Sequence, residues 1–198
     1  DGRLADLSPL GLAGVAQGPV GFSARADGDL AAPRLAATAR LAAADFAGQR
    51  WTNLEAGTQS ETFARHRVTL TGSGPLGAVN ITSGLDLADG VALRGLAARF
   101  GALTLRGDLA RPVGQAWRGV LAVSGAGLDG RVALAQPRAA PRLDIDLQGR
   151  DVRLPLARPI AIGRLDARGA LLLEPAMPRF VGRVEMDKAA ISRLVLDR

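Results

Sequence analysis

An alternation of apolar and polar residues recurs along this chain and constrains its fold more than any other feature. In the segment VGFSARADGDL, residues 20–30, Val20, Phe22 and Leu30 share one parity, and the charged residues share the other. A period of two is typical of a β-strand with one dry and one wet face. The same period returns in RVTLTG (67–72), VALRG (91–95), ALTLRGDLA (102–110), RLDIDLQG (142–149), GRLDARGALLLE (163–174) and FVGRVEMDK (180–188).

Turn-forming residues separate these segments at a roughly regular spacing, as in a meander of short strands. They include Asp89-Gly90, Asp129-Gly130, Pro75 and Pro112. The Ala-rich stretch 34–48 has the weakest strand signal, because alanine favours helix in isolation. We therefore predict an all-β chain with at most one short helical segment.

One element occurs twice, as GDLAAP at residues 28–33 and as GDLARP at residues 107–112. Repetition of a strand-and-turn unit indicates an elongated sheet in which each unit covers the edge of its neighbour. The proline in each copy lacks a donor for the strand ladder and should end a strand. We expect residues 1–198 to form one continuous β-repeat segment of a longer protein, because the chain starts at Asp1 without a methionine.

The composition limits what can cover the dry face of such a sheet. Hydrophobic residues make up 47% of the chain but aromatic residues only 4%, and no helix is predicted to pack on the sheet. Two arrangements remain open from the residues alone. In a β-sandwich the dry faces pack on each other, whereas in an open apolar trough a ligand covers part of the face. The absence of cysteine excludes disulfides and thiolate sites.

The net charge of +6 raises the question of an anionic partner. The arginines are scattered singly between apolar residues, as at Arg94, Arg106, Arg131 and Arg153, which is typical of a solvated strand face. We therefore expect no nucleic-acid partner, and anionic lipid headgroups remain a further alternative. The uncharged stretch 7–24 contains two prolines and four glycines and makes a poor membrane helix.

The sequence predicts no enzyme, no metal site and no cofactor. GAGLDG, residues 125–130, matches a dinucleotide-binding string, but a strand-like segment follows where that motif needs a helix, so we predict a glycine turn. His66 shares parity with Val68 and is predicted to be a partly covered strand residue. Asp144 and Asp146 share one strand face, where they could hold a cation or, more commonly, face water.

Four segments together resemble the TamB family, within the AsmA-like group of bridge-like lipid-transfer proteins of Gram-negative bacteria. They are GDLAAPRLAATARL (28–41), DGVALRGLAARFGALTLRGDLARP (89–112), RGVLAVSGAGLDGRVAL (118–134) and PAMPRFVGRVEMDKAAIS (175–192). The resemblance covers most of the chain and rests on repeat texture. It implies a periplasmic protein, anchored to the inner membrane through a segment outside this one. It also implies a long sheet curled into an open, taco-like apolar trough that carries phospholipid toward the outer membrane, with a TamA-type barrel as partner.

With the resemblance, the elongated and curled antiparallel or mixed sheet becomes the favoured fold, and the β-sandwich becomes the alternative. The expected function is a lipid conduit in outer-membrane biogenesis, in contact with phospholipid and with neighbouring repeats of its own chain. A scaffold for outer-membrane protein assembly, or an adhesin-like passenger, is the alternative function. The residues expected to line the lipid groove are Val20, Phe22, Leu30, Val68, Leu70, Val91, Leu93, Phe100, Leu103, Leu105, Leu109, Leu121, Val123, Val132, Leu134, Leu143, Ile145, Leu147, Leu165, Leu171, Leu173, Val184 and Met186.

Overall fold

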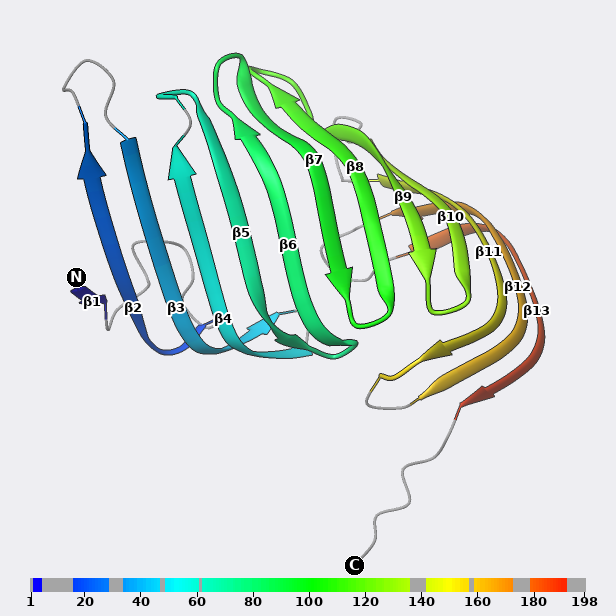
Figure 1. Ribbon diagram of the computed structural model, residues 1–198. Coiled ribbons are helices and arrows are strands. Elements are labelled where there is room, and N and C mark those ends of the chain that lie inside the picture. Colours follow the sequence, from blue (N-terminus) through cyan, green and yellow to red (C-terminus); the bar gives the residue numbers. More distant parts are fainter. Residues whose placement is uncertain are drawn as a thin grey trace, which may run out of the picture.

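The computed structural model describes residues 2–4, 16–28, 34–46, 49–60, 62–135, 142–156, 159–172 and 179–191. They form one sheet of 13 strands, and each strand pairs antiparallel with its neighbours in sequence (Figure 1). The strands are β1 (Gly2–Leu4), β2 (Ala16–Asp27), β3 (Arg34–Phe46), β4 (Gln49–Ser60), β5 (Arg65–Gly74), β6 (Gly77–Asp86), β7 (Gly90–Phe100), β8 (Leu103–Pro112), β9 (Arg118–Gly125), β10 (Leu128–Ala135), β11 (Arg142–Leu154), β12 (Ile160–Leu172) and β13 (Arg179–Ile191).

The prediction of an all-β chain is confirmed, and every segment with a period of two forms a strand. The Ala-rich stretch also forms a strand, β3, so the described residues contain no helix. Pairing with β2 and β4 on both sides of β3 satisfies its backbone in the ladder, and this tertiary context overrides the helix propensity of alanine.

The two copies of the repeated element take different places. In the first copy Gly28 follows β2, and residues 29–33 lie outside the described residues. The second copy lies inside β8, where Asp108 pairs with Val120 and Leu109 with Gly119 of β9. The second copy therefore continues the ladder, as the alternation in ALTLRGDLA predicts. Pro112 does end β8, as its missing donor predicted.

The sheet is a simple meander and does not close on itself. In the described residues the strand order follows the sequence from β1 to β13, and the substantial contacts between strands are those between sequence neighbours. The alternative of a β-sandwich is wrong for this part of the chain, because all of the described strands belong to one hydrogen-bonded sheet and a sandwich needs two. The strand pairing is antiparallel throughout.

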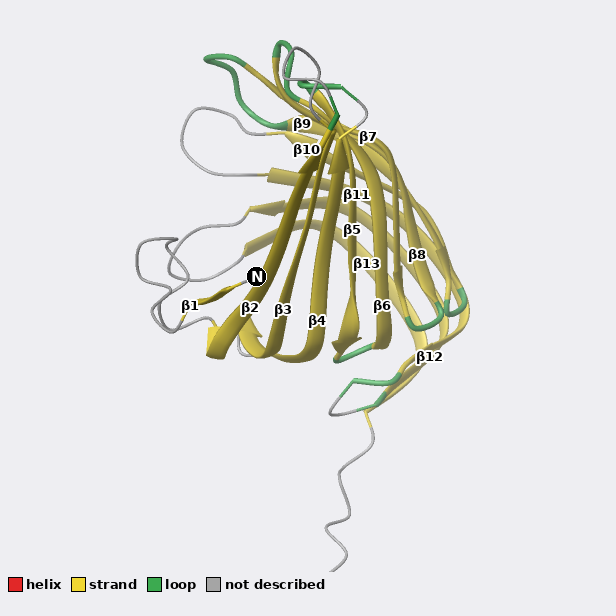
Figure 2. Ribbon diagram, turned by 60° about the vertical axis from the view of Figure 1, so that its left-hand side comes forward, coloured by secondary structure: helices red, strands yellow, loops and turns green. Residues whose placement is uncertain are grey.

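The sheet is strongly curved. In Figure 1 the C-terminal strands β9–β13 bend round behind β5–β8. The turned view in Figure 2 shows an open, curved shell whose hollow side faces left. The sheet therefore has an inner and an outer face, and its two terminal strands, β1 and β13, lie far apart in the strand order.

A β-bulge in β7 is one source of this curvature. The register of β7 shifts against both β6 and β8 around Arg94 and Gly95, and Gly95 has a φ of 58°. The Ser83 hydroxyl of β6 donates to the Arg94 carbonyl at 3.2 Å. The Asp108 carboxylate of β8 accepts the Gly95 N–H at 2.6 Å. An extra residue in one strand bends it and increases its twist, so the two flanking strands hold the bend in place.

A second bend lies near the end of β11. Asp151 has a φ of 48°, and the backbone N–H groups on either side of it donate to the β9–β10 turn. Arg150 N–H bonds Gly127 O at 2.9 Å, and Arg153 N–H bonds Ala126 O at 3.2 Å. The long strand β11 is thereby folded over the end of a shorter hairpin, which satisfies carbonyls that the turn would leave to water.

Candidate functional site: the inner apolar face

The strand register gathers the predicted lining residues on one face. Neighbouring pairs such as Leu70 with Ile81, Leu105 with Val123 and Ile145 with Val132 fix which side chains share a face. All of the predicted lining residues that the structure describes fall on that face by register, which we call the inner face. Leu30 and Leu173 lie outside the described residues.

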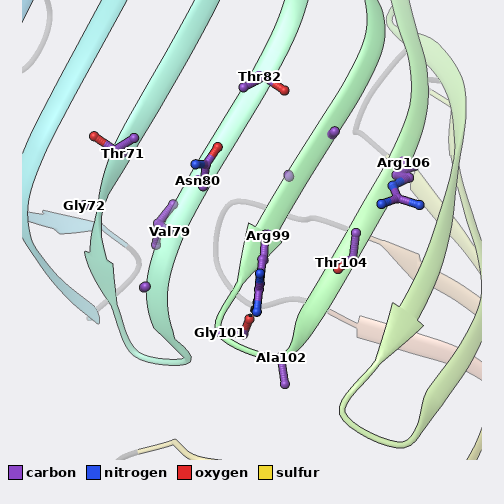
Figure 3. A pocket seen from close by; sticks show the side chains of 13 residues that line it. Thr71, Gly72, Val79, Asn80, Thr82, Arg99, Gly101, Ala102, Thr104 and Arg106 are labelled. Carbon is purple, nitrogen blue, oxygen red and sulfur yellow. Dashed lines mark hydrogen bonds between the residues drawn. The ribbon is translucent and has the colours of Figure 1, made fainter.

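The polar parity forms the outer face. In Figure 3 the outer side chains of Asn80, Thr82 and Arg106 stand in front of the ribbon, and the orange C-terminal strands lie behind it. Since those strands curve round behind β5–β8, the apolar parity faces the hollow side of the sheet. The chain thus places most of its large apolar side chains on the concave side and most of its charged ones on the convex side, with Val120 and Val181 as apolar exceptions on the outer face.

One row of register partners crosses the inner face from β2 to β13 without a polar residue. Every member is apolar or glycine. The row reads Phe22, Ala39, Ala56, Leu70, Ile81, Ala98, Leu105, Val123, Gly130, Leu147, Ala167 and Val184. With strands about 4.8 Å apart, this apolar path is roughly 50 Å long along the sheet.

Two further apolar rows run parallel to it from β6 to β13, the first four residues and the second two residues away along most strands. One comprises Leu85, Leu93, Leu109, Gly119, Leu134, Leu143, Leu171 and Phe180. The other comprises Val79, Phe100, Leu103, Gly125, Leu128, Gly149, Leu165 and Met186. The inner face is consequently a broad, mainly apolar surface, with polar residues such as Ser83, Thr58 and His66 on the same parity in β4 to β6.

Burial of this surface falls from the middle of the sheet toward its C-terminal edge. Val79 and Val123 are 4% and 5% exposed, whereas Val184 and Met186 of β13 are 43% and 57% exposed. Bulky neighbours on both sides shield a central side chain, but β13 has a described neighbour only in β12. Apolar surface therefore remains open to solvent at the C-terminal strands.

An aromatic pair packs near the β5–β6 turn. The rings of Trp51 and Phe100 meet edge to face with centroids 6.1 Å apart, a favourable geometry for two aromatic quadrupoles. Gly74 makes space for the Trp51 ring, since a Cβ at position 74 would lie 2.6 Å from that ring. The indole Nε1 of Trp51 is buried without a hydrogen-bond partner among the described residues.

Sequence reasoning missed several inner residues. Val79 and Ile81 of β6 alternate with polar residues in GAVNITSGLD, so the period of two could have identified them. Leu96 of β7 is different, because it changes parity relative to Leu93. The bulge at Gly95 causes that change, and only its isolated glycine within a strand pattern signals it. Val152 was missed for the same reason, because the parity of β11 changes at the bend at residue 151. Its side chain is 1% exposed.

The outer face carries ion pairs between neighbouring strands. Arg40 of β3 bonds Glu55 of β4 through its Nε at 2.9 Å and through Nη2 at 3.3 Å. This hydrogen bond, and then the charge of Glu55, raise the pKa of Arg40. Arg94, Arg106, Arg131 and Arg153 are all exposed, as expected for a solvated face. The prediction that single arginines mark the wet parity is confirmed for these four.

The residues considered as possible catalytic or ligand-binding sites lie at ordinary strand and turn positions. His66 is half-buried as the second residue of β5, and its Nε2 lies 3.2 Å from the Phe63 carbonyl. Asp144 pairs with Arg142, while Asp146 lies 3.5 Å from Arg131 and 3.3 Å from Arg168. Residues 126–127 form the turn between β9 and β10, which confirms the predicted glycine turn. In the described ranges no group of three or more histidine or acidic side chains could hold a metal ion.

These observations define the class of the protein as an all-β chain built on a single open, curved antiparallel sheet. Comparisons with protein-family models, with curated proteins and with solved structures found no match. No helix among the described residues is long and apolar enough to cross a membrane.

Proposed function

We propose that this chain is a segment of a periplasmic lipid conduit, in which the inner face forms an open apolar trough that shields phospholipid acyl chains. The sequence resemblance to the TamB family supports this function. It also supports a place in outer-membrane biogenesis, between an inner-membrane anchor outside this segment and a TamA-type barrel. Neighbouring repeats of the same protein would continue the trough at its open ends.

The observation that carries the proposal is the unbroken apolar row from Phe22 to Val184. Among the described residues no second sheet or helix packs on this row. Apolar surface left in water is unfavourable, and each methylene of an acyl chain laid on it gains about 0.8 kcal/mol. An acyl chain therefore supplies the apolar contacts that a second layer supplies in a sandwich.

The dimensions favour a path over a pocket. The row is roughly 50 Å long at about 4.8 Å per strand, which exceeds the hydrocarbon core of a bilayer at about 30 Å. A binding pocket for one lipid tail would need only part of this length. A continuous row suits a lipid that slides from strand to strand, because its contacts at each step are alike.

Photocrosslinking tests the proposal at matched positions. A photoreactive residue at Leu103 or Leu147 reports on the inner face, and one at Thr104 or Gln148, the adjacent positions, reports on the outer face. We expect phospholipid adducts from the inner positions and at least tenfold fewer from the outer ones. Organic extraction of the purified chain should yield phospholipid. Equal labelling of the two faces together with a lipid-free extract would overturn the conduit.

The open edge of β13 favours a second candidate, a scaffold that binds protein strands. β13 is 13 residues long and pairs with β12 alone among the described strands. An unpaired strand edge of this length can accept a further strand. Capture of an outer-membrane protein strand at this edge, with no lipid on the inner face, would favour the scaffold over the conduit.

A further inference from the structure

The outer face carries a hollow that the lipid path does not use. It has a volume of about 930 Å³ and spans β5 to β8 beside the two hairpin turns at residues 75–76 and 101–102 (Figure 3). Small residues at outward positions, such as Ala78 and Ala97, leave the space between longer side chains. Its polar lining consists of Thr71, Asn80, Thr82, Arg99, Thr104 and Arg106.

The hollow is positively charged. It contains two guanidinium groups, and none of its lining residues is acidic. Three further hollows of this protein each include aspartate, namely Asp86 and Asp89 in one, Asp144 in another, and Asp144 with Asp146 in the third. A cationic hollow without a carboxylate therefore differs from these three hollows, and from outer arginines such as Arg40, Arg131 and Arg168, which pair with acidic side chains.

The strand register explains why these two cations have no acidic partner on the neighbouring strands. Arg99 lies between Asn80 and Thr104, and Arg106 lies between Ala97 and Ala122. Asp108, two residues along from Arg106, accepts the Gly95 N–H at the bulge. No ion pair joins Arg99 or Arg106 to a carboxylate in the described part of the chain.

One of the two guanidinium groups is held in position. The Arg99 Nε donates to the Gly101 carbonyl at 2.9 Å, which fixes the side chain along the β7–β8 turn. Its terminal Nη groups keep their donors for another acceptor. A planar guanidinium that is already oriented loses less freedom on binding, and its fork matches the oxygens of phosphate.

We propose that this hollow is a binding site for a phosphate ester of a polyol, separate from the inner face. Arg99 and Arg106 bind the phosphate oxygens. The hydroxyls of Thr71, Thr82 and Thr104 and the amide of Asn80 bond the hydroxyl groups of the polyol. The ligand is either a free polyol phosphate or the headgroup of a lipid such as phosphatidylglycerol, since both present the same chemistry.

Calorimetry with the whole chain tests the site. The probes are glycerol 3-phosphate, glycerol, and vesicles of phosphatidylglycerol or of phosphatidylcholine. The double variant Arg99→Gln/Arg106→Gln removes the two charges. Arg150→Gln/Arg164→Gln is the matched control. These two exposed arginines lie opposite each other in the register of β11 and β12, and they line none of the hollows described. Ala97→Leu fills the hollow without changing the charge.

We expect the parent to bind glycerol 3-phosphate or the phosphatidylglycerol vesicles at least tenfold more tightly than the Arg99/Arg106 variant. Ala97→Leu should lower the affinity by a similar factor, and the affinity of the control variant should stay within twofold of that of the parent. Binding of the soluble ester identifies a free ligand, and binding of the vesicles alone identifies a headgroup. The proposal fails if neither probe binds, or if the control loses as much as the Arg99/Arg106 variant. Neither result bears on the lipid path of the opposite face.

Discussion

The two faces of the sheet differ at adjacent positions of the same strands. The inner row from Phe22 to Val184 contains only apolar residues and glycine. The row beside it on the outer face is polar, charged or small throughout. It reads Ser23, Thr38, Gly57, Thr69, Thr82, Ala97, Arg106, Ala122, Arg131, Asp146, Arg168 and Arg183. A shift of one residue along each strand thus separates two surfaces of opposite chemistry.

The outer surface presents polar and charged side chains to water, whereas the inner surface presents mainly apolar ones. Outer charges are solvated or paired, as Asp146 is with Arg131 and Arg168. Inner side chains have no second sheet or helix packed against them among the described residues. The contrast shows that an alternating sequence can specify a sheet without specifying what covers it.

An arginine on the inner face should have the largest effect. Leu105→Arg, Ile145→Arg or Leu171→Arg places a charge on the apolar path, at a cost of about 2.5 to 3.5 kcal/mol where lipid covers it. The fold should survive in part, because the open face lets the guanidinium reach water at the rim. Circular dichroism melting curves give the stability, and lipid crosslinking from Leu103 or Leu147 gives the occupancy.

Ser124→Arg is the matched outer variant. Ser124 is exposed on β9 and lies opposite Thr104 and Asp129, so a new arginine there meets water and a carboxylate. Its stability should stay within about 0.5 kcal/mol of the parent, with lipid labelling unchanged. Global unfolding of all three inner variants, with no lipid adduct in the parent, would instead indicate a closed core.

The sequence was sufficient to predict the strands and their faces where alternation is uninterrupted. In β8, β11 and β13 a single parity runs along the predicted segment, and the ladder keeps it. Antiparallel pairing then brings equal parities together without further information. The inner face could therefore be predicted for most strands from local pattern alone.

Other features depend on contacts distant in sequence. The bulge at Gly95 reverses the parity of β7, and its partners Ser83 and Asp108 lie in two other strands. The choice between a sandwich and an open sheet is also invisible to alternation, because each presents one dry face. The outer hollow likewise requires the register that aligns Arg99 beside Asn80 and Thr104.

Loss of the bulge partner should have the next largest effect. Asp108→Ala removes the acceptor 2.6 Å from the Gly95 N–H and should lower the free energy of unfolding by about 1 kcal/mol. Urea denaturation measures the change. Asp129→Ala, on the same face in β10, should change stability by less than half as much. Equal losses at the two positions would mean that charge alone, and not the bulge, accounts for the effect.

A charge at the sheet edge should cost less than one in the middle of the same face. Val184 on β13 is 43% exposed, so Val184→Lys should destabilise the fold by less than about 1 kcal/mol. We expect the parent to dimerise edge to edge at high concentration, and an inward-pointing lysine on the edge strand to suppress this. Light scattering over a concentration series measures both. A parent that is strictly monomeric throughout would contradict the prediction.

The smallest effect should come from the outer ion pairs. Asp146→Asn removes a carboxylate 3.3 Å from Arg168 and 3.5 Å from Arg131, both of which are exposed. Exposed pairs contribute about 0.2 to 1 kcal/mol, and Arg168 also lies 3.4 Å from Asp166, which can replace the lost partner. We expect a loss of about 0.5 kcal/mol at low ionic strength that disappears near 1 M salt, where charges are screened beyond about 3 Å. Melting curves at the two salt concentrations measure it. A loss above 2 kcal/mol that salt does not reduce would show that the outer face also depends on specific buried contacts, and the contrast between the faces would fail.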